Sequence, residues 1–228
     1  MPTMSDRHML LKTFLLAVSL CLIGGCANPF VAPRGYAAPD QNPVRPDGGP
    51  VVMPAHAPSI TQGFAPEPQA DVQNAVHEGI DIYAAMGTPV IAPADGVVIR
   101  SYGEPFYGNH IVIDHGTDDR GRSIRTVYWH LDGRLVNKND SVIRGQLIGA
   151  LGRSGLLGLL PHLHFEVRVG TDKEGFTPVN PHLFWADGPG VVTCFDPARH
   201  YAPEMFCITY PVVCPDPRTT ADDERNRP

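Results

Sequence analysis

The chain has 228 residues, a formal net charge of −6 and an aromatic content of 8%. This length allows one good-sized domain with tails, and the acidic balance excludes the basic surface that nucleic-acid binding requires, so no nucleic-acid partner is expected. The 24 prolines and 23 glycines favour a loop-rich β protein over a helical one.

The first 25 residues are typical of an export signal. Arg7 and Lys12 precede an apolar run at 13–23, which is too short to span a bilayer, and two glycines then precede Cys26. The ending Ile-Gly-Gly-Cys resembles a bacterial lipobox, which implies cleavage before Cys26 and a lipid on its thiol. A simple secretory signal and an uncleaved anchor are the alternatives. Double acylation would hold the exported protein on a membrane, and we expect it to face the periplasm.

Residues 26–58 are rich in proline and show no apolar periodicity. They predict an extended linker that holds a folded domain away from the membrane. The folded domain is expected at 59–187. Residues 188–228 then form a cysteine-containing extension that ends in a charged tail, which is predicted to be disordered.

Strand signals follow one another through the central part of the chain. A polar segment with glycine at 117–122 predicts a hairpin loop, and the glycine-punctuated stretch 140–158 predicts turns between short strands. No convincing amphipathic helix is present, so the fold class is mainly β, an antiparallel sandwich or barrel-like domain with long irregular tails. The clearest strand signals lie at 88–103, with a turn inside it, and at 109–116, 123–131 and 162–169.

Four cysteines remain once the signal is removed: Cys26, Cys194, Cys207 and Cys214. If Cys26 carries lipid, the other three allow three single-bridge pairings with one thiol left over, because exported chains normally oxidise such cysteines. A structural zinc site that adds His200 to the same three cysteines is the rival interpretation. It is disfavoured because an oxidising compartment competes for the thiols.

Residues 161–169 read PHLHFEVRV. Alternate side chains share one face of a strand, so His162, His164 and Glu166 point to one side while the apolar residues between them point to the core. The polar face fits a metal or catalytic site, and it equally fits solvent exposure. The spacing alone does not decide between them.

Two other segments supply matching partners. His77 and Asp81 lie four residues apart in HEGID, where Gly79 and the β-rich surroundings predict an extended or turn segment entering a strand, and His130 ends the run YWH. A catalytic zinc site takes three protein ligands and leaves one position for water, and imidazole and carboxylate suit Zn²⁺. The remaining histidines lie in no such pattern: His8, His56, His110, His115, His182 and His200.

The segments HEGIDIYAAMGTPVIAPADGVV, YWHL, GQLIGALGRSG and PHLHFEVR together resemble the LytM/lysostaphin-type zinc metallopeptidases, which cut peptidoglycan cross-bridges and stem peptides. The resemblance covers roughly residues 59–182. It implies a metallopeptidase domain in which His77, Asp81 and His164 hold one Zn²⁺ ion, with His130 and His162 as the catalytic pair.

The resemblance therefore implies a zinc endopeptidase that acts on peptidoglycan peptides. A zinc-bound water would attack the peptide carbon, and because no HExxH motif is present, His130 and His162 would share the proton transfers. All five positions are filled, which favours an enzyme over the family's non-catalytic members that activate a cell-wall amidase. Cell-wall enzyme partners and a non-wall peptide substrate both stay open, and the expected membrane contact is through lipidated Cys26.

Three residue environments are left undecided by the sequence. Family members often have Phe-Gly-x-Arg ahead of the first ligand, but here Gly63 and Phe64 are followed by Ala65 and a proline, which puts the groove wall and the substrate preference in question. Glu166 is either solvated or hydrogen-bonded to a site histidine. Tyr128, expected on the same strand face as His130, lines the groove or packs in the core.

Overall fold

The computed structural model describes residues 45, 49–67, 76–118, 120–201 and 205–215. The expected signal peptide, the lipobox cysteine and the charged tail from residue 216 onward lie outside these residues. Within the described ranges, no helix is both long enough and apolar enough to cross a membrane.

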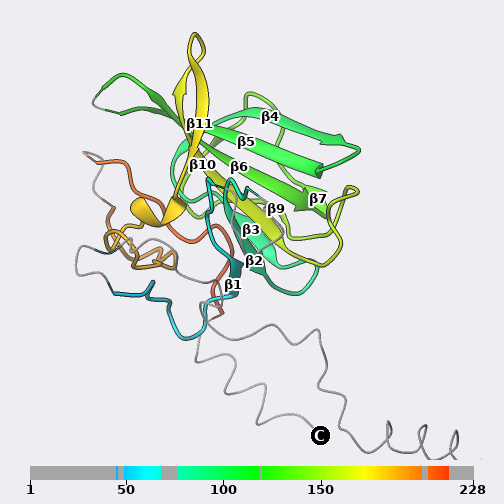
Figure 1. Cartoon of the computed structure of the whole chain (residues 1–228), viewed down its shortest axis with the longest axis horizontal. Helices are drawn as coiled ribbons and strands as arrows, with labels where there is room; N and C mark the ends of the chain where they lie inside the picture. The colour runs from blue at the N-terminus through cyan, green and yellow to red at the C-terminus, as the bar shows by residue number, and fades with distance from the viewer. Residues whose placement is uncertain (1–44, 46–48, 68–75, 119, 202–204, 216–228) are drawn as a thin grey trace, which may run out of the picture. The chain divides into compact units, whose positions relative to one another are not determined.

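A large antiparallel sheet forms the body of the domain (Figure 1). Its β10–β11 and β5–β6 hairpins extend beyond the rest of the domain at the top of the view. In spatial order the strands are β1 (Ser59–Gln62), β2 (Ile80–Tyr83), β10 (Leu163–Thr171), β6 (Ser123–Leu131), β5 (Gly108–Thr117), β4 (Gly96–Glu104) and β8 (Ser141–Val142), and β11 (Gly175–Val179) pairs with β10.

A second, smaller antiparallel sheet packs on the first through the hydrophobic core. Val90 and Ile148 from the small sheet join Ile111 and Phe165 from the large sheet in one buried cluster. The mainly β, antiparallel fold predicted from the sequence is therefore confirmed, and a single 3₁₀ turn, η1 (Pro181–Leu183), interrupts it among the described residues. The small sheet contains β3 (Pro89–Ile91), β9 (Leu147–Ala150) and β7 (Gly133–Arg134).

Strand β10 has the two faces that its sequence predicts. Leu163, Phe165 and Val167 are fully buried in the core, where each large apolar side chain stabilises the fold by about 1.5–3 kcal/mol. His164 and Glu166 lie on the opposite face. This central strand is held between β2 and β6, so its polar face is anchored on both sides.

Part of the segment expected to be linker packs on the domain instead. Val51 is buried, and the backbone of Val52 exchanges hydrogen bonds with Gly190 and Val192 at 2.8 and 2.9 Å. The short apolar run around Val51 pairs with an equally apolar run in the C-terminal extension, which gives it a reason to leave solvent. Ordered structure thus begins before residue 59.

The C-terminal extension also supplies part of the core. Ile208, Tyr210 and Val212 are fully buried. Cys194 and Cys214 form a disulfide, and Cys207 is a free thiol. The disulfide selects one of the three open pairings and excludes the rival zinc site, because two of its four ligands are consumed.

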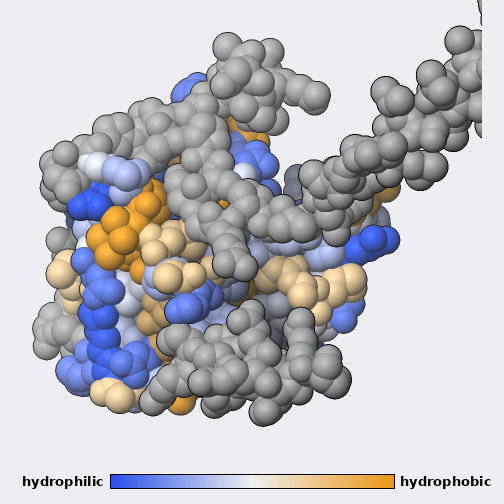
Figure 2. Space-filling view, turned by 90° about the horizontal axis from the view of Figure 1, so that it is seen from below, coloured by the Kyte–Doolittle hydropathy of each residue, from blue (hydrophilic) through white to orange (hydrophobic). Residues whose placement is uncertain are grey.

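The surface seen from below Figure 1 mixes polar and apolar residues, with one patch of hydrophobic residues bordered by hydrophilic ones (Figure 2).

Candidate functional site

Strand register brings two of the predicted ligands together. Asp81 on β2 lies directly opposite His164 on β10. The two strands approach closely at this point, because a Cβ atom at Gly79 would lie only 2.3 Å from the carbonyl oxygen of Phe165. Gly79 in HEGID is therefore required by this close approach, and the predicted entry of the segment into a strand is confirmed, because β2 begins at Ile80.

His77 reaches the same place from a short bridge ahead of β2. Its backbone N–H and C=O pair with Ala65 at 2.8 and 2.9 Å. Its ring Nδ1 lies 2.6 Å from the carbonyl oxygen of Gly63. The stretch around Gly63, read from sequence as a groove wall, thus has a second role in orienting His77.

The three side chains form a compact triangle of potential ligand atoms. His77 Nε2 lies 3.1 Å from Asp81 Oδ1 and 3.0 Å from His164 Nδ1, and His164 Nδ1 lies 2.8 Å from Asp81 Oδ1. The structure places these three residues as a group able to hold a metal ion. All three come from positions that the sequence had predicted.

The hydrogen bonds of the two rings decide which nitrogens face the triangle. His77 Nδ1 must carry a proton to donate to the Gly63 carbonyl, which leaves a lone pair on Nε2. His164 Nε2 donates to Glu166 Oε1 at 3.1 Å, which leaves a lone pair on Nδ1. With both imidazoles neutral, two nitrogen lone pairs and one carboxylate oxygen converge within hydrogen-bond distance without a proton between them.

This arrangement fits a zinc ion. Three convergent lone pairs repel one another unless a cation lies among them, and tetrahedral zinc with bonds near 2.0–2.1 Å would separate its ligand atoms by about 3.3 Å, close to the spacing observed. Two imidazoles and a carboxylate are also ligands that suit Zn²⁺. The residues therefore form a candidate His-Asp-His metal site.

The electrostatics of the triangle favour a positive charge at the same point. Burial opposes charge on Asp81, but hydrogen bonds from His164 and His77 outweigh burial and hold its pKa well below the usual range. Burial alone would lower the pKa of His164, yet its hydrogen bonds to Asp81 and Glu166 raise it to about 9. A metal ion satisfies the same field, and its binding releases the proton.

His130 enters the cavity through a bulge at the end of β6. Opposite it, β5 contributes one residue, His110, where β6 contributes Trp129 and His130. His130 has a φ angle of 63°, the left-handed conformation that costs a non-glycine residue about 1–3 kcal/mol. Its N–H donates to the Tyr107 carbonyl at 3.1 Å, and its Nδ1 donates to the Ser154 carbonyl at 3.0 Å.

The bulge settles the environment of Tyr128. Simple alternation would have put Tyr128 and His130 on one face, and that expectation is wrong because the left-handed residue breaks the alternation. Tyr128 is fully buried, with its ring 5.5 Å from that of Phe165 and its hydroxyl bonded to Thr126. It is a core residue.

His162 lies just before β10 and beside His130. Its Nδ1 donates to the Leu160 carbonyl at 2.8 Å, and its Nε2 lies 3.9 Å from Asp81 Oδ1. The His130 and His162 rings are 4.6 Å apart. Each ring therefore uses Nδ1 to hold its position and keeps Nε2 for chemistry. Burial lowers the pKa of His130, which favours the neutral form that can accept a proton.

A single cavity of about 430 Å³ connects the two groups of residues. Tyr107 and Leu157 form one part of its wall. They lie on the loops 105–107 and 154–160, which are joined by backbone hydrogen bonds such as Leu157 N–H to Phe106 O at 3.0 Å. A peptide in the cavity would meet the histidines on one side and this wall on the other. The cavity is lined by Val76, His77, Glu78, Asp81, Tyr107, His130, Leu157, His162, His164 and Glu166.

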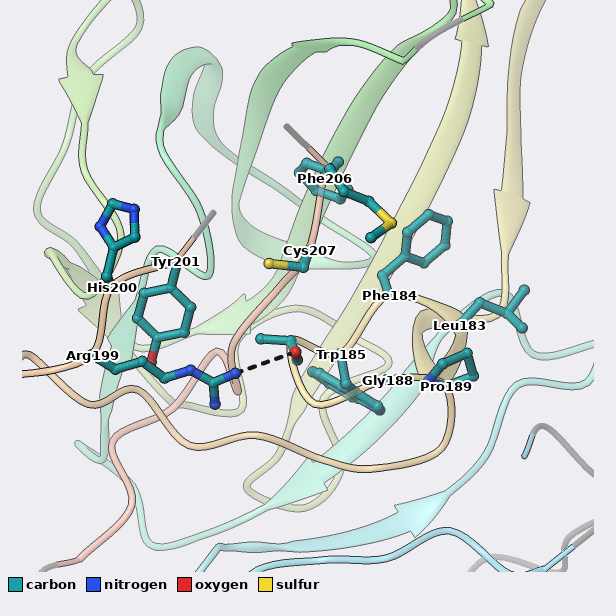
Figure 3. A pocket seen from close by; sticks show the side chains of 12 residues that line it. Leu183, Phe184, Trp185, Gly188, Pro189, Arg199, His200, Tyr201, Phe206 and Cys207 are labelled. Atoms are coloured by element: carbon teal, nitrogen blue, oxygen red, sulfur yellow. Dashed lines mark hydrogen bonds between the residues drawn. The ribbon is translucent and has the colours of Figure 1, made fainter. Parts of the chain in front are cut away.

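A second cavity of about 390 Å³ lies against the C-terminal extension (Figure 3). Phe184, Trp185 and Phe206 give it an aromatic lining, and Arg199 donates to the Ala186 carbonyl at 3.4 Å across one edge. It includes the free thiol of Cys207 but none of the five predicted site residues. All five predicted site residues therefore lie in the first cavity.

Comparison with known proteins points to the same segment. Residues 75–181 match the family described as Peptidase family M23. Peptidoglycan DD-endopeptidase ShyB of Vibrio cholerae serotype O1 is 42% identical over 112 residues, which are 48% of this chain and 25% of that protein. DD-carboxypeptidase/endopeptidase Mpg of Neisseria meningitidis serogroup B is 37% identical over 106 residues, which are 46% of this chain and 22% of that protein.

A solved structure is similar as well. The crystal structure of a zinc-containing peptidase from Vibrio cholerae shares 38% identity, covers 57% of this chain and 37% of that chain, and has a TM-score of 0.47. This chain spans only about a quarter of the length of the curated relatives above. The family match begins before His77 and ends after His164, so it includes every predicted site residue. Residues 75–181 therefore belong to peptidase family M23.

Proposed function

We propose that this chain is a zinc-dependent endopeptidase that hydrolyses peptide bonds in peptidoglycan stem peptides or cross-links. The observation that carries the proposal is the convergence of three potential ligand atoms on one point, beside two histidines whose Nδ1 atoms are held by backbone carbonyls. The activities in the names of ShyB and Mpg support D,D-cross-links as the substrate.

His77, Asp81 and His164 would hold one Zn²⁺ ion. When bound in such a site, zinc polarises a carbonyl group and lowers the pKa of a water molecule towards neutrality. The chain's own contribution is to fix the ligand atoms in advance. Asp81 does so from β2, His164 from β10, and His77 through its bond to the Gly63 carbonyl.

His130 and His162 would handle the protons. In hydrolysis, water adds to the scissile carbonyl carbon, the C–N bond breaks, and the proton that the water loses finishes on the leaving amine. A neutral imidazole Nε2 in the cavity can accept that proton and return it. The Ser154 and Leu160 carbonyls orient both rings for this task, and Glu78 and Leu157 complete the walls in which the peptide lies.

The test is digestion of purified muropeptides of defined structure, with mass spectrometry to identify the bond that is cut. Zinc-loaded protein should release the two stem peptides of a D,D-cross-linked dimer. An Asp81→Asn variant, folded but without its carboxylate ligand, should release neither. If the parent protein binds zinc but cuts no muropeptide and instead stimulates a purified cell-wall amidase, the chain is a regulator and the proposal is wrong.

We further propose that the N-terminal segment places the protein in the cell envelope. The lipobox-like ending at Cys26 supports export, lipidation and a membrane anchor. Residues 26–58 would be the spacer, apart from the segment around Val51 that packs on the domain, and 59–187 the peptidase domain. Cys26 lies outside the described residues. Mass spectrometry of the mature N-terminus should find a diacylglyceryl-modified Cys26, and an unmodified N-terminus would reduce the proposal to simple secretion.

A further inference from the structure

Glu166 is a buried carboxylate at the edge of the metal site, and its position calls for an explanation. Its exposed fraction is only 2%. A carboxylate so buried is costly unless hydrogen-bond donors surround it. Three side-chain N–H groups do so: His164 Nε2 and Trp129 Nε1 each lie 3.1 Å from Oε1, and Arg168 Nε contacts Oε2.

Strand pairing explains why these partners meet. His164 and Glu166 are two residues apart on β10 and share a face. Trp129 on β6 lies opposite His164 in the ladder. This makes Trp129 the diagonal neighbour of Glu166, which is within reach of a long aromatic side chain. One carboxylate oxygen therefore joins a predicted metal ligand on β10 to the tryptophan that precedes His130 on β6.

The bond from His164 has a chemical consequence. An imidazole can bind a metal through either ring nitrogen, and the acceptor on the other nitrogen decides which one is free. Glu166 accepts from Nε2 and so directs Nδ1 to Asp81 and His77. His77 has the opposite arrangement, since the Gly63 carbonyl holds its Nδ1. A charged acceptor also makes the metal-binding nitrogen a stronger donor than a neutral carbonyl does.

The tryptophan is itself held in place. Its ring lies 4.8 Å from that of Tyr107 and 4.3 Å from that of His110. Both Tyr107 and His110 belong to the end of β4–β5 that also positions His130, because the Tyr107 carbonyl accepts the His130 N–H. The indole N–H thus reaches Glu166 from a fixed direction. Tyr107 supports both Trp129, through its ring, and His130, through its carbonyl.

We infer that Glu166 is a positioning residue that sets the tautomer of His164 for metal binding, and that the Trp129 indole N–H holds the same carboxylate oxygen in place. The inference rests on the proposed zinc site. It assigns Glu166 no contact with the substrate, and it predicts that zinc affinity, measured without any substrate, depends on both side chains.

The experiment measures the zinc dissociation constant by competition with a chromophoric chelator for the parent and three variants. Glu166→Gln keeps the shape but turns the charged acceptor into an amide, and it should weaken zinc binding about 10- to 100-fold. Trp129→Phe keeps an aromatic ring and loses the N–H, and it should weaken zinc binding about 2- to 10-fold, as expected for one hydrogen bond. Glu174→Gln, at an exposed turn, is the matched control and should leave the constant unchanged.

Cobalt substitution gives a second measurement. The visible absorption of the Co²⁺-loaded protein reports the geometry of the ligands, and it should differ between Glu166→Gln and the parent but not between Glu174→Gln and the parent. If Glu166→Gln does not fold, as judged by circular dichroism, Trp129→Phe alone decides. Zinc affinity and cobalt spectra equal to the parent's in every folded variant would overturn the inference. A parent protein that binds no zinc would instead refute the proposed function itself.

Discussion

The two halves of the cavity are built in different ways. His77, Asp81 and His164 lie on paired backbone, and their side chains contact one another. His130 and His162 lie where strands end or begin, and backbone carbonyls of the 154–160 loop hold both rings. A metal site needs lone pairs fixed in advance, whereas a proton carrier needs one nitrogen left free. The difference teaches that the two groups can be separated experimentally.

Loss of a ligand should have the largest effect. His77→Ala, Asp81→Ala and His164→Ala each remove one corner of the triangle, so zinc content measured by elemental analysis should fall from one ion per chain to near zero, and cleavage should vanish with it. Two remaining ligands hold zinc more weakly than three, so added zinc should not restore full occupancy. A ligand variant that keeps stoichiometric zinc would break the distinction between the two halves.

Changes in the other half should separate metal binding from catalysis. His130→Ala and His162→Ala should keep zinc bound while kcat falls by about 10²–10⁴-fold, the usual contribution of a general acid or base. His56→Ala replaces an exposed histidine outside the cavity and serves as the control. If His162→Ala loses the metal while His164→Ala keeps it, the roles within the HxH pair are reversed.

The sequence predicted the metal half of the site better than its surroundings. Strand periodicity put His164 on a polar face, and Gly79 argued against a helix at HEGID, because both features depend on local backbone rules. The predicted strand at 123–131 agrees with β6. The grouping of His77 and Asp81 with His164 came only through the family resemblance. The register of β2 against β10, which brings Asp81 opposite His164, is not written in either strand alone.

Other features depended on contacts between segments far apart in the chain. The left-handed φ of His130 arises at a bulge, where β6 has one more residue than the paired stretch of β5. No local sequence pattern predicts this bulge. The role of Glu166 was left open because it requires Trp129 to lie diagonally across the sheet. Strand β11 escaped prediction because it is short and contains a proline, which is tolerated at the edge of a sheet.

Acidification offers a third way to probe the residues that support His130 and His162. His110 is buried against Trp129, one of its ring nitrogens, Nδ1, has no hydrogen-bond partner among the described residues, and burial lowers its pKa to about 4. A histidine in the unfolded chain has a pKa near 6.5. The unfolded state therefore binds more protons between these values. The stability contributed by the neutral ring is present above pH 6.5 and is lost as the pH falls towards 4.

The measurement is the free energy of unfolding in urea across this pH range. Each histidine of this kind should contribute a slope of at most about 1.4 kcal/mol per pH unit. His110→Phe keeps an aromatic ring in the stack and removes the titration, so its stability should depend less steeply on pH. Some slope should remain, because burial also lowers the pKa values of His115 and His182 to about 4. A slope equal to the parent's would contradict this reading of His110.

The cavity wall at Leu157 should give the smallest effect and the finest comparison, because Leu157 lies in the same loop whose carbonyls hold the rings of His130 and His162. Leu157 is half exposed and lines the cavity. Leu157→Ala therefore removes about half of the contact area that a fully buried leucine would make with a bound peptide. It should raise KM about 5-fold with little change in kcat. Leu159→Ala, on the same loop but outside the cavity lining, should change neither constant. If Leu157→Ala lowers kcat as strongly as His162→Ala, the Leu157 side chain acts by holding the loop in place. The positions of His130 and His162 would then depend on loop packing as much as the metal site depends on strand register.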